Sequence, residues 1–209
     1  MVRPAIFLDR DGTLNIEKEY LFRIDDWEWI PGAVEAIKLI NMMGYLAVVV
    51  TNQAGVARGY YDEEDILELH RQVDKMLAAE GAWIDAYYYC PHHSEYGSVQ
   101  GCGCRKPAHG MLLAARRDLH IDLAKSFMIG DKAIDVAAGV AAGVTPVLVM
   151  TGYGRAQSAL VDISVHRSAA ILDACQYIEK VRLGLQNGVQ SFQDPGEKNV
   201  EKFSPQVVQ

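Results

Sequence analysis

The chain has 209 residues, a formal net charge of -7 from 20 basic and 27 acidic side chains, and a hydrophobic fraction of 50%. Its length fits one domain with a tail, and its composition is that of a folded globular protein. The acidic balance disfavours a binder of duplex nucleic acid, which needs a broad basic face. Small anionic substrates stay compatible with it, because a few local cations outweigh a mild overall charge.

The sequence holds no sign of a membrane or secretion segment. Its apolar runs are shorter than the ~18 residues of a membrane span, and the first run stops at Asp9, too early for a signal peptide. We therefore expect a cytoplasmic protein with no membrane partner. Three of the four cysteines lie in one short segment together with His92. In a reducing compartment such clustering predicts a metal site.

Short apolar runs and helical periodicities alternate along the chain. Strands are predicted at residues 4–8, 46–50, 84–89, 126–130 and 146–150, with a further short edge strand at 162–165. Helices are predicted at residues 31–44, 62–80, 111–119, about 132–142 and 168–183, with Asp62 as an N-cap. This alternation predicts the α/β class, a Rossmann-like doubly wound parallel sheet.

Two segments depart from this alternation. Residues 90–104 contain several glycines and the cysteine cluster, and we expect them to form a metal-bound loop inserted near the site. Beyond residue 184 the chain is rich in Gln, Asn, Gly, Pro and charge, without a sustained apolar period. The sequence thus predicts one domain over 1–184 and a flexible tail over 185–209.

Polar residues follow the predicted strands where each strand ends. Asp9, Asp11, Thr51, Asn52 and Asp131 all occupy such positions. In an open parallel sheet these positions converge on one crevice. Three carboxylates brought together need a cation, and oxygen ligands favour Mg²⁺ with a substrate phosphate. An Asp-x-Asp pair alone is more often an ordinary turn, so the prediction of a Mg²⁺-phosphate site depends on the whole set.

The order of these motifs resembles that of the haloacid dehalogenase-like phosphatases. The motifs that carry the resemblance are residues 7–13, 50–52, 106 and 130–131. The resemblance spans roughly 5–151 and implies a Rossmann-like fold. Within that superfamily, residues 51–59, the Cys-Pro-His-His run and the Cys-Gly-Cys-Arg-Lys-Pro run are similar to the D-glycero-D-manno-heptose 1,7-bisphosphate 7-phosphatases. This similarity implies removal of the 7-phosphate on the route to nucleotide-activated heptose for surface polysaccharide.

The resemblance gives the acidic residues separate roles. It implies that Asp9 attacks phosphorus and forms an aspartyl-phosphate, while Asp11 protonates the departing sugar oxygen and later activates water. Asp9, Asp131 and the backbone carbonyl of Asp11 are expected to hold Mg²⁺.

Three further residues are expected at the phosphoryl group. Thr51 and Asn52 can hydrogen-bond its oxygens, and Lys106 adds a positive charge where negative charge accumulates. Without the motif context, Thr51 and Asn52 would fit a helix N-cap equally well, and Lys106 would fit a solvated loop lysine.

Substrate recognition is expected from loop residues. Arg105 is favoured as a recognition residue over a partner in a surface ion pair, whereas both interpretations stay open for Arg58. The resemblance implies that Asn15, Glu17 and Tyr20 belong to the family's substrate-facing loop, although Glu17 and Tyr20 fit surface and packing roles equally well. The full expected substrate-binding set is Asn15, Glu17, Tyr20, Asn52, Gln53, Arg58 and Arg105.

The cysteine cluster is interpreted as a structural zinc site. Three thiolates and one imidazole suit tetrahedral Zn²⁺, with no position left for water. The ligands are expected to be Cys90, His92, Cys102 and Cys104, and the resemblance selects His92 over His93. The alternatives are a disulfide between Cys102 and Cys104 or free thiols.

Other functions compete with this interpretation. The nearest alternatives are phosphatases acting on histidinol phosphate or on a generic small sugar phosphate. A phosphate-binding module without turnover is disfavoured because the chain keeps Asp9, Asp11, Lys106 and Asp131. We expect a monomer whose partner is a small phosphorylated sugar.

Overall fold

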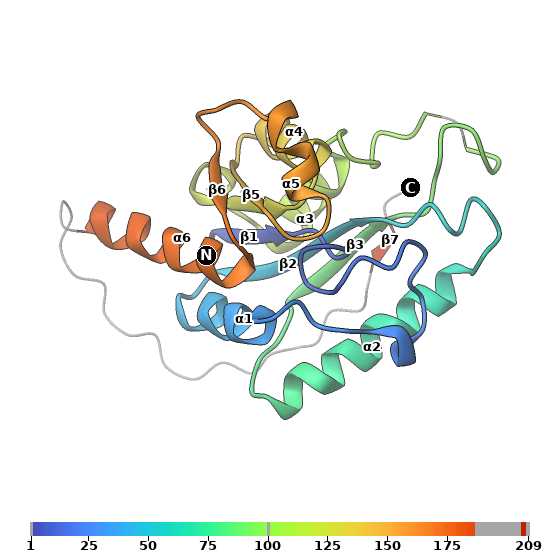
Figure 1. The fold of residues 1–209 in the computed structure, drawn as a ribbon, viewed down its shortest axis with the longest axis horizontal. Helices are drawn as coiled ribbons and strands as arrows, with labels where there is room; N and C mark the ends of the chain where they lie inside the picture. Colours follow the sequence, from blue (N-terminus) through green and yellow to red (C-terminus); the bar gives the residue numbers. More distant parts are fainter. Residues whose placement is uncertain (1, 100, 187–205, 208–209) are drawn as a thin grey trace.

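The computed structural model describes residues 2–99, 101–186 and 206–207 and contains one parallel sheet in the order β6-β5-β4-β1-β2-β3-β7 (Figure 1). The strands are β1 (Ala5–Leu8), β2 (Leu46–Asn52), β3 (Ala86–Cys90), β4 (Phe127–Gly130), β5 (Thr145–Val149), β6 (His166–Ser168) and β7 (Gln206–Val207). The α-helices are α1 (Ala33–Met42), α2 (Glu63–Ala79), α3 (Gly110–Leu119), α4 (Ala133–Ala142), α5 (Gly154–Gln157) and α6 (Ile171–Gln186). Single 3-10 turns occur at Ile24–Asp26, Leu123–Lys125 and Ser158–Leu160. The predicted Rossmann-like α/β architecture is confirmed.

The central strand β1 is buried on both faces, and its side chains alternate between two cores. Ile6 and Leu8 pack in the cluster that includes residues of α1, α2 and α6. Ala5 and Phe7 pack in the cluster that includes residues of α3 and α4. Figure 1 shows these two groups of helices on opposite faces of the sheet. Because side chains alternate along a strand, a continuous apolar run is what a strand between two helical layers requires.

The strand order reverses at β1, which has β2 on one side and β4 on the other. Phe7 is the register partner of Val48 in β2 and of Met128 in β4. The pairing continues past the end of β1, because the Asp9 N–H donates to the Ile129 carbonyl at 2.9 Å. Residues at the carboxyl ends of β1 and β4 therefore meet at the switch point, where open α/β sheets bind their ligands.

The predicted helix start at Asp62 is confirmed by its hydrogen bonds. The Asp62 side chain accepts from the Asp65 N–H, and the Asp65 side chain accepts from the Asp62 N–H, each at 3.0 Å. This capping box satisfies two backbone donors that the first turn of α2 leaves unpaired.

Some boundaries differ from the sequence prediction. The edge strand expected at 162–165 lies instead at His166–Ser168, because Asp162 closes a turn with the N–H and hydroxyl of Ser164. The last helix consequently begins at Ile171 and not at residue 168. Strand β3 ends at Cys90, so the strand itself delivers the first cysteine of the cluster.

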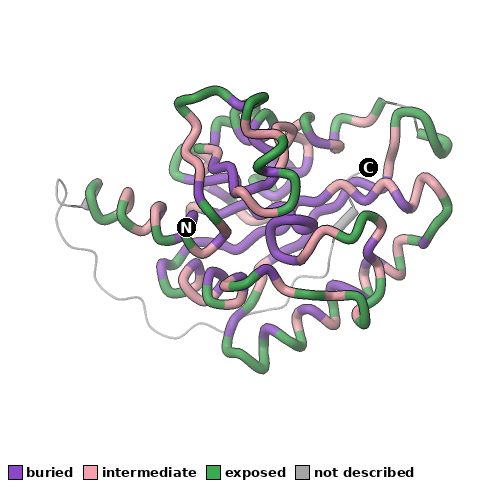
Figure 2. The backbone as a smooth tube through the Cα atoms, in the orientation of Figure 1, coloured by how far each residue is buried: buried purple, intermediate pink, exposed green. Residues whose placement is uncertain are grey.

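Buried backbone is concentrated in the strands at the centre of the molecule (Figure 2). Within the tail predicted at 185–209, residues up to Gln186 complete α6 and Gln206–Val207 pair with β3. The rest of that tail lies outside the described residues, so its flexibility stays a prediction. Among the described residues, no helix combines the length and apolar character needed to cross a membrane.

Candidate active site

A buried ion pair connects the end of β1 to the loop before α3. Lys106 Nζ lies 2.7 Å from Asp9 Oδ1 and donates to the Val50 carbonyl at 2.8 Å. The exposed fractions are only 4% for Asp9 and 3% for Lys106. Burial alone would raise the pKa of Asp9, but the charges of Lys106 and Lys132 bring it below its ordinary value. Asp9 is therefore an ionised carboxylate in a site nearly closed to water.

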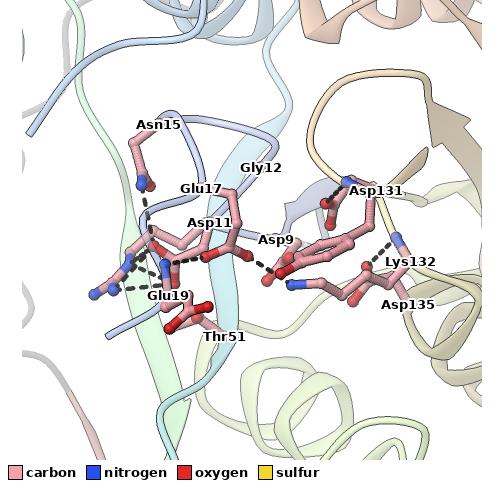
Figure 3. Close-up of polar contacts among 12 residues, drawn as sticks. Asp9, Asp11, Gly12, Asn15, Glu17, Glu19, Thr51, Asp131, Lys132 and Asp135 are labelled. Carbon is pink, nitrogen blue, oxygen red and sulfur yellow. Dashed lines mark hydrogen bonds and ion pairs between the residues drawn. The ribbon is translucent and has the colours of Figure 1, made fainter. Parts of the chain in front are cut away.

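Two more carboxylates complete this corner of the site. Asp131 follows β4, and Asp135 lies in the first turn of α4, with its Oδ1 2.7 Å from Lys106 Nζ. Carboxylate oxygens of Asp9, Asp131 and Asp135 all lie within 4.8 Å of one another (Figure 3). Burial and then the charge of Asp9 raise the pKa of Asp131 to about 8. Burial raises the pKa of Asp135 to about 6, against the opposing effect of Lys106.

The cluster of three carboxylates has the properties of a cation site. The Oδ2 atom of Asp131 accepts from the Tyr153 N–H at 2.7 Å, whereas its buried Oδ1 has no hydrogen-bond partner among the residues that the structure describes. A buried acceptor without a donor is costly, and a bound cation would satisfy it. Oxygen-only ligands favour a hard divalent ion such as Mg²⁺.

Gly12 lets the loop after β1 approach Asp131 closely. Its φ is +86°, and a Cβ built at this position would lie 2.2 Å from Asp131 Oδ2. A side chain here would clash and would also strain the backbone. The glycine of the Asp-Gly-Thr motif is thus required by the packing of Asp131.

Asp11 lies apart from the three clustered carboxylates. Its oxygens accept hydrogen bonds from Arg10, Asn15 and Gln53 at 3.0 to 3.2 Å, and they are not part of the group formed by Asp9, Asp131 and Asp135. Figure 3 shows Asp11 and Asn15 to one side of Asp9, with Asp131 and Asp135 to the other. Asn15 and Gln53, expected at the substrate, here bond the carboxylate of Asp11.

A cavity of about 410 Å³ opens beside the carboxylates. It is lined by Glu17, Glu19, Tyr20, Lys132, Tyr153 and Gln157. Of the expected substrate-binding residues, Glu17 and Tyr20 contribute to it. Lys132 also lines a smaller cavity that contains Asp9, Asp11, Thr51, Asn52 and Lys106. The Lys132 ammonium lies 2.9 Å from Glu17 Oε2 and 4.7 Å from the centre of the Tyr153 ring.

The remaining expected residues have different surroundings. Thr51 is buried, accepts from Gln53 Nε2 at 2.8 Å and lines the small cavity. Arg105 donates to the His92 carbonyl at 3.0 Å, and Arg58 stacks against tyrosine rings. Neither arginine lines the two cavities.

The four residues expected to bind zinc are brought together. The Cys90 sulfur lies 3.2 Å from Cys104 Sγ and 3.5 Å from Cys102 Sγ, and His92 Nδ1 lies 3.4 Å from Cys104 Sγ. All four donor atoms lie within 4.8 Å of one another. These sulfur separations exceed the ~2.05 Å of a disulfide bond and approach the edges of a tetrahedron with ~2.3 Å metal–sulfur bonds.

The electrostatics of the cluster also suit a metal. Burial works against ionisation of Cys102, yet hydrogen bonds with Cys104 and the Arg105 backbone lower its pKa to about 6. Burial raises the pKa of Cys90. Thiols must lose their protons to bind a metal. The lowered pKa of Cys102 favours its thiolate form, and a divalent cation would in turn favour ionisation of the neighbouring thiols.

Three functional candidates were absent from the sequence prediction. Asp135 completes the group of three carboxylates, Lys132 lines both cavities, and Arg10 pairs with Asp11 at 3.0 Å. The available signal for Asp135 was its position four residues after Asp131, at the start of a predicted helix. An acidic residue in a first helical turn is common for capping alone, so the sequence does not mark Asp135 as a member of the carboxylate group.

Known proteins resemble this chain over most of its length. A family model described as "HAD-hyrolase-like" matches residues 103–174. The D-glycero-beta-D-manno-heptose-1,7-bisphosphate 7-phosphatase of Photorhabdus laumondii is 51% identical over 153 residues, or 71% of this chain and 81% of that protein. The protein of the same name from Escherichia coli is 51% identical over 154 residues, covering 71% of this chain and 80% of its own length.

Solved structures of heptose bisphosphate phosphatases are also similar to this chain. The D,D-heptose 1,7-bisphosphate phosphatase of B. bronchiseptica, complexed with magnesium and phosphate, has a TM-score of 0.77 and 32% identity, covering 85% of this chain and 99% of that one. The enzyme of the same name from Burkholderia thailandensis has a TM-score of 0.64 and 29% identity, with the same coverage of 85% and 99%.

Proposed function

The chain belongs to the family of D-glycero-beta-D-manno-heptose-1,7-bisphosphate 7-phosphatases, and we propose that it hydrolyses the 7-phosphate of this sugar bisphosphate. The observation that carries the proposal is the buried Asp9–Lys106 pair beside Asp131 and Asp135, in a chain 51% identical to these relatives. The beta anomer is proposed as the substrate because the relatives are named for it.

The reaction proceeds in two displacements at phosphorus. A carboxylate oxygen of Asp9 attacks the 7-phosphoryl group, and the bond from phosphorus to the sugar oxygen breaks. That oxygen leaves with the electron pair and takes a proton from Asp11. In the second displacement Asp11 takes a proton from water, whose oxygen attacks the aspartyl-phosphate and releases inorganic phosphate from Asp9.

Neighbouring groups hold these two carboxylates in place. Lys106 fixes Asp9 Oδ1 at 2.7 Å and places its positive charge where negative charge develops on the phosphoryl oxygens. Thr51 is proposed to donate its hydroxyl to one of these oxygens. Asp11 accepts from three side chains in this structure, so proton donation requires it to release some of them.

Asp9, Asp131 and Asp135 are proposed to hold magnesium, together with the backbone carbonyl of Asp11. The unpartnered Asp131 Oδ1 supports this assignment, and a heptose bisphosphate phosphatase of similar structure is complexed with magnesium and phosphate. When bound, magnesium neutralises charge on the transferring phosphoryl group.

The sugar is proposed to occupy the cavity beside the carboxylates. Glu17 and Tyr20 offer hydrogen-bonding groups for hydroxyls, and Lys132 stands between this cavity and Asp9. Arg105 is proposed to recognise the phosphate at carbon 1, since a guanidinium can bind a phosphate with two hydrogen bonds.

Cys90, His92, Cys102 and Cys104 are proposed to bind a structural zinc ion. Their mutual distances support a closed four-ligand site. The site would fix the loop that carries Arg105, since the Arg105 guanidinium donates to the carbonyl of His92.

Four free cysteines fit a reducing compartment, which supports a cytoplasmic location. A monomer is also proposed, and size-exclusion chromatography with light scattering tests it.

The activity is tested by phosphate release from purified protein with magnesium. The substrates are both anomers of the heptose bisphosphate, histidinol phosphate and fructose 1,6-bisphosphate. We expect the highest kcat/KM for the beta anomer, and phosphorus NMR should show a product that keeps its 1-phosphate. A higher kcat/KM for histidinol phosphate, or release of the 1-phosphate first, overturns the proposal.

A further inference from the structure

The guanidinium of Arg58 lies against tyrosine rings from two other loops. Its carbon Cζ is 4.0 Å from the centre of the Tyr96 ring and 5.8 Å from the centre of the Tyr20 ring. Tyr20 also meets the Tyr60 ring edge-on, with 4.7 Å between the centroids. Both ring centres lie within the ~6 Å over which a cation is attracted to an aromatic face.

The loop that carries Tyr96 also packs closely on the loop that carries Arg58. Gly97, next to Tyr96, has a φ of +80°, and a Cβ built on it would lie 3.3 Å from the Cβ of Ala57, next to Arg58. The segment after β3 therefore packs on the segment after β2 immediately beside the ring contact. Two adjacent residue pairs, Arg58 with Tyr96 and Ala57 with Gly97, therefore hold these two loops together.

The two tyrosines belong to different parts of the candidate site. Tyr20 lines the cavity of about 410 Å³ beside the carboxylates. Tyr96 lies between His92 and Cys102, within the loop that joins the ligands of the proposed zinc site. Arg58 itself lines neither cavity, and within the described part of the chain its buried Nε has no hydrogen-bond partner. The contacts of its guanidinium carbon are with the rings of Tyr96 and Tyr20.

We propose that Arg58 is a positioning residue that couples the loop of Cys90–Cys104 to the Tyr20 wall of the substrate cavity. This inference rests on the proposed function for its kinetic consequence. The two rings share one cation, so the loss of Arg58 removes a contact from Tyr20 and from Tyr96 at the same time. Loss of the cation loosens both loops and weakens sugar binding, while the chemistry at Asp9 continues.

The test compares Arg58→Met, which keeps a long apolar stem without the charge, with Arg58→Lys, which keeps a cation. Arg71→Met is the matched control, because Arg71 lies on the exposed side of α2 and its ion pairs within the described residues are with Glu64 and Glu68. For each protein we measure kcat, KM for the heptose bisphosphate, and hydrogen–deuterium exchange in peptides covering 17–22, 54–60 and 92–99.

For Arg58→Met we expect KM to rise about 5- to 30-fold with kcat within about twofold, as two lost cation–ring contacts imply. Exchange should accelerate in both segments. Arg58→Lys should recover part of both effects, and Arg71→Met should match the parent. Adding Tyr96→Leu to Arg58→Met should cause little further change, because both substitutions break the same contact.

Three results overturn the inference. These are unchanged KM and exchange in Arg58→Met, a fall in kcat at constant KM, and faster exchange confined to residues 54–60. Exchange does not depend on turnover. If the parent fails to hydrolyse heptose bisphosphate yet both segments loosen together, the proposed function fails while the coupling of the loops stands.

Discussion

Asn52 holds the backbone of Lys106 with both ends of its amide. Its Nδ2 donates to the Lys106 carbonyl at 3.1 Å, and its Oδ1 accepts from the Lys106 N–H at 3.0 Å. The residue at the end of β2 thereby fixes the backbone from which the Lys106 ammonium reaches Asp9. The two are far apart in sequence, so this loop depends on the sheet for its position.

Replacing Asn52 by Asp should damage catalysis more than it damages the fold. The carboxylate accepts from the Lys106 N–H but repels the Lys106 carbonyl, so the lysine is displaced from Asp9. We expect kcat to fall about 10- to 100-fold, the size of one or two misplaced hydrogen bonds at a charged site. Steady-state kinetics and thermal unfolding measure the two effects.

The chain supplies a matched control for this variant. Asn41 makes the same two-ended contact with the backbone of Trp83, at 3.0 and 3.1 Å, away from the carboxylates. Asn41→Asp should lower thermal stability without changing kcat. If the two variants lose activity equally, Asn52 acts through general stability and not through Lys106.

Asp9→Asn should keep the fold and abolish turnover. The amide is similar in shape to the carboxylate, but it cannot attack phosphorus and it is a poor ligand for a divalent ion. We expect kcat to fall by several powers of ten, as when an acting group is deleted. Circular dichroism checks the fold, and substantial activity in a preparation free of host phosphatase would falsify the assignment of the nucleophile.

Magnesium binding should weaken as the pH falls below about 8. Burial and the charge of Asp9 raise the pKa of Asp131 to about 8 in the metal-free protein, so at neutral pH this carboxyl is largely protonated. Binding needs the carboxylate, so the apparent Kd should rise about tenfold for each pH unit below that pKa. Calorimetry in two buffers of different ionisation enthalpy should detect proton release.

The same shift has a consequence for stability. The folded metal-free protein binds more protons than the unfolded chain between the ordinary pKa of 3.8 and the raised value of about 8. The contribution of Asp131 to the free energy of unfolding therefore decreases as pH rises through this window, and magnesium reverses the loss. Affinity and melting temperature that do not vary with pH from 6 to 9 would contradict this account.

The sequence predicted the parts of the site that follow buried strands. Asp9 and Asp131 stand directly after apolar runs, and parallel strands bring such positions together. Asp135 was not predicted, because the sequence pattern of an acidic residue in a first helical turn is the same when that residue only caps the helix. The contact of Arg58 with Tyr20 and Tyr96 depends on how three loops pack. Loop packing leaves no periodic signal in the sequence.

Removing one cysteine of the cluster should remove both metal and stability. Cys102→Ala leaves three ligands for zinc, so elemental analysis should fall from about one zinc per chain in the parent, and the melting temperature should drop. Cys175→Ala is the control, because Cys175 is buried in α6 outside the cluster. A parent without zinc, or a Cys102→Ala variant that melts like the parent, rejects the zinc site.

Arg105 and Lys106 are adjacent, yet their substitutions should affect different substrates. Lys106 Nζ lies 2.7 Å from Asp9 Oδ1, so its charge acts where the 7-phosphate reacts. The Arg105 guanidinium donates to the His92 carbonyl at 3.0 Å and is directed toward the loop of the Cys/His cluster. Lys106→Ala should therefore lower kcat/KM equally for the heptose bisphosphate and for heptose 7-phosphate.

Arg105→Ala should instead lower kcat/KM for the bisphosphate more than for the monophosphate, because only the bisphosphate carries the phosphate at carbon 1. Loss of a charge-assisted hydrogen bond corresponds to roughly 10- to 150-fold, which steady-state kinetics resolve. Arg105→Lys keeps the charge but not the planar fork, so it should fall between the parent and the alanine variant. Zinc content measured in parallel separates a lost phosphate contact from a disturbed Cys/His loop. Equal losses for the two substrates, with zinc retained, would show that Arg105 does not bind the second phosphate.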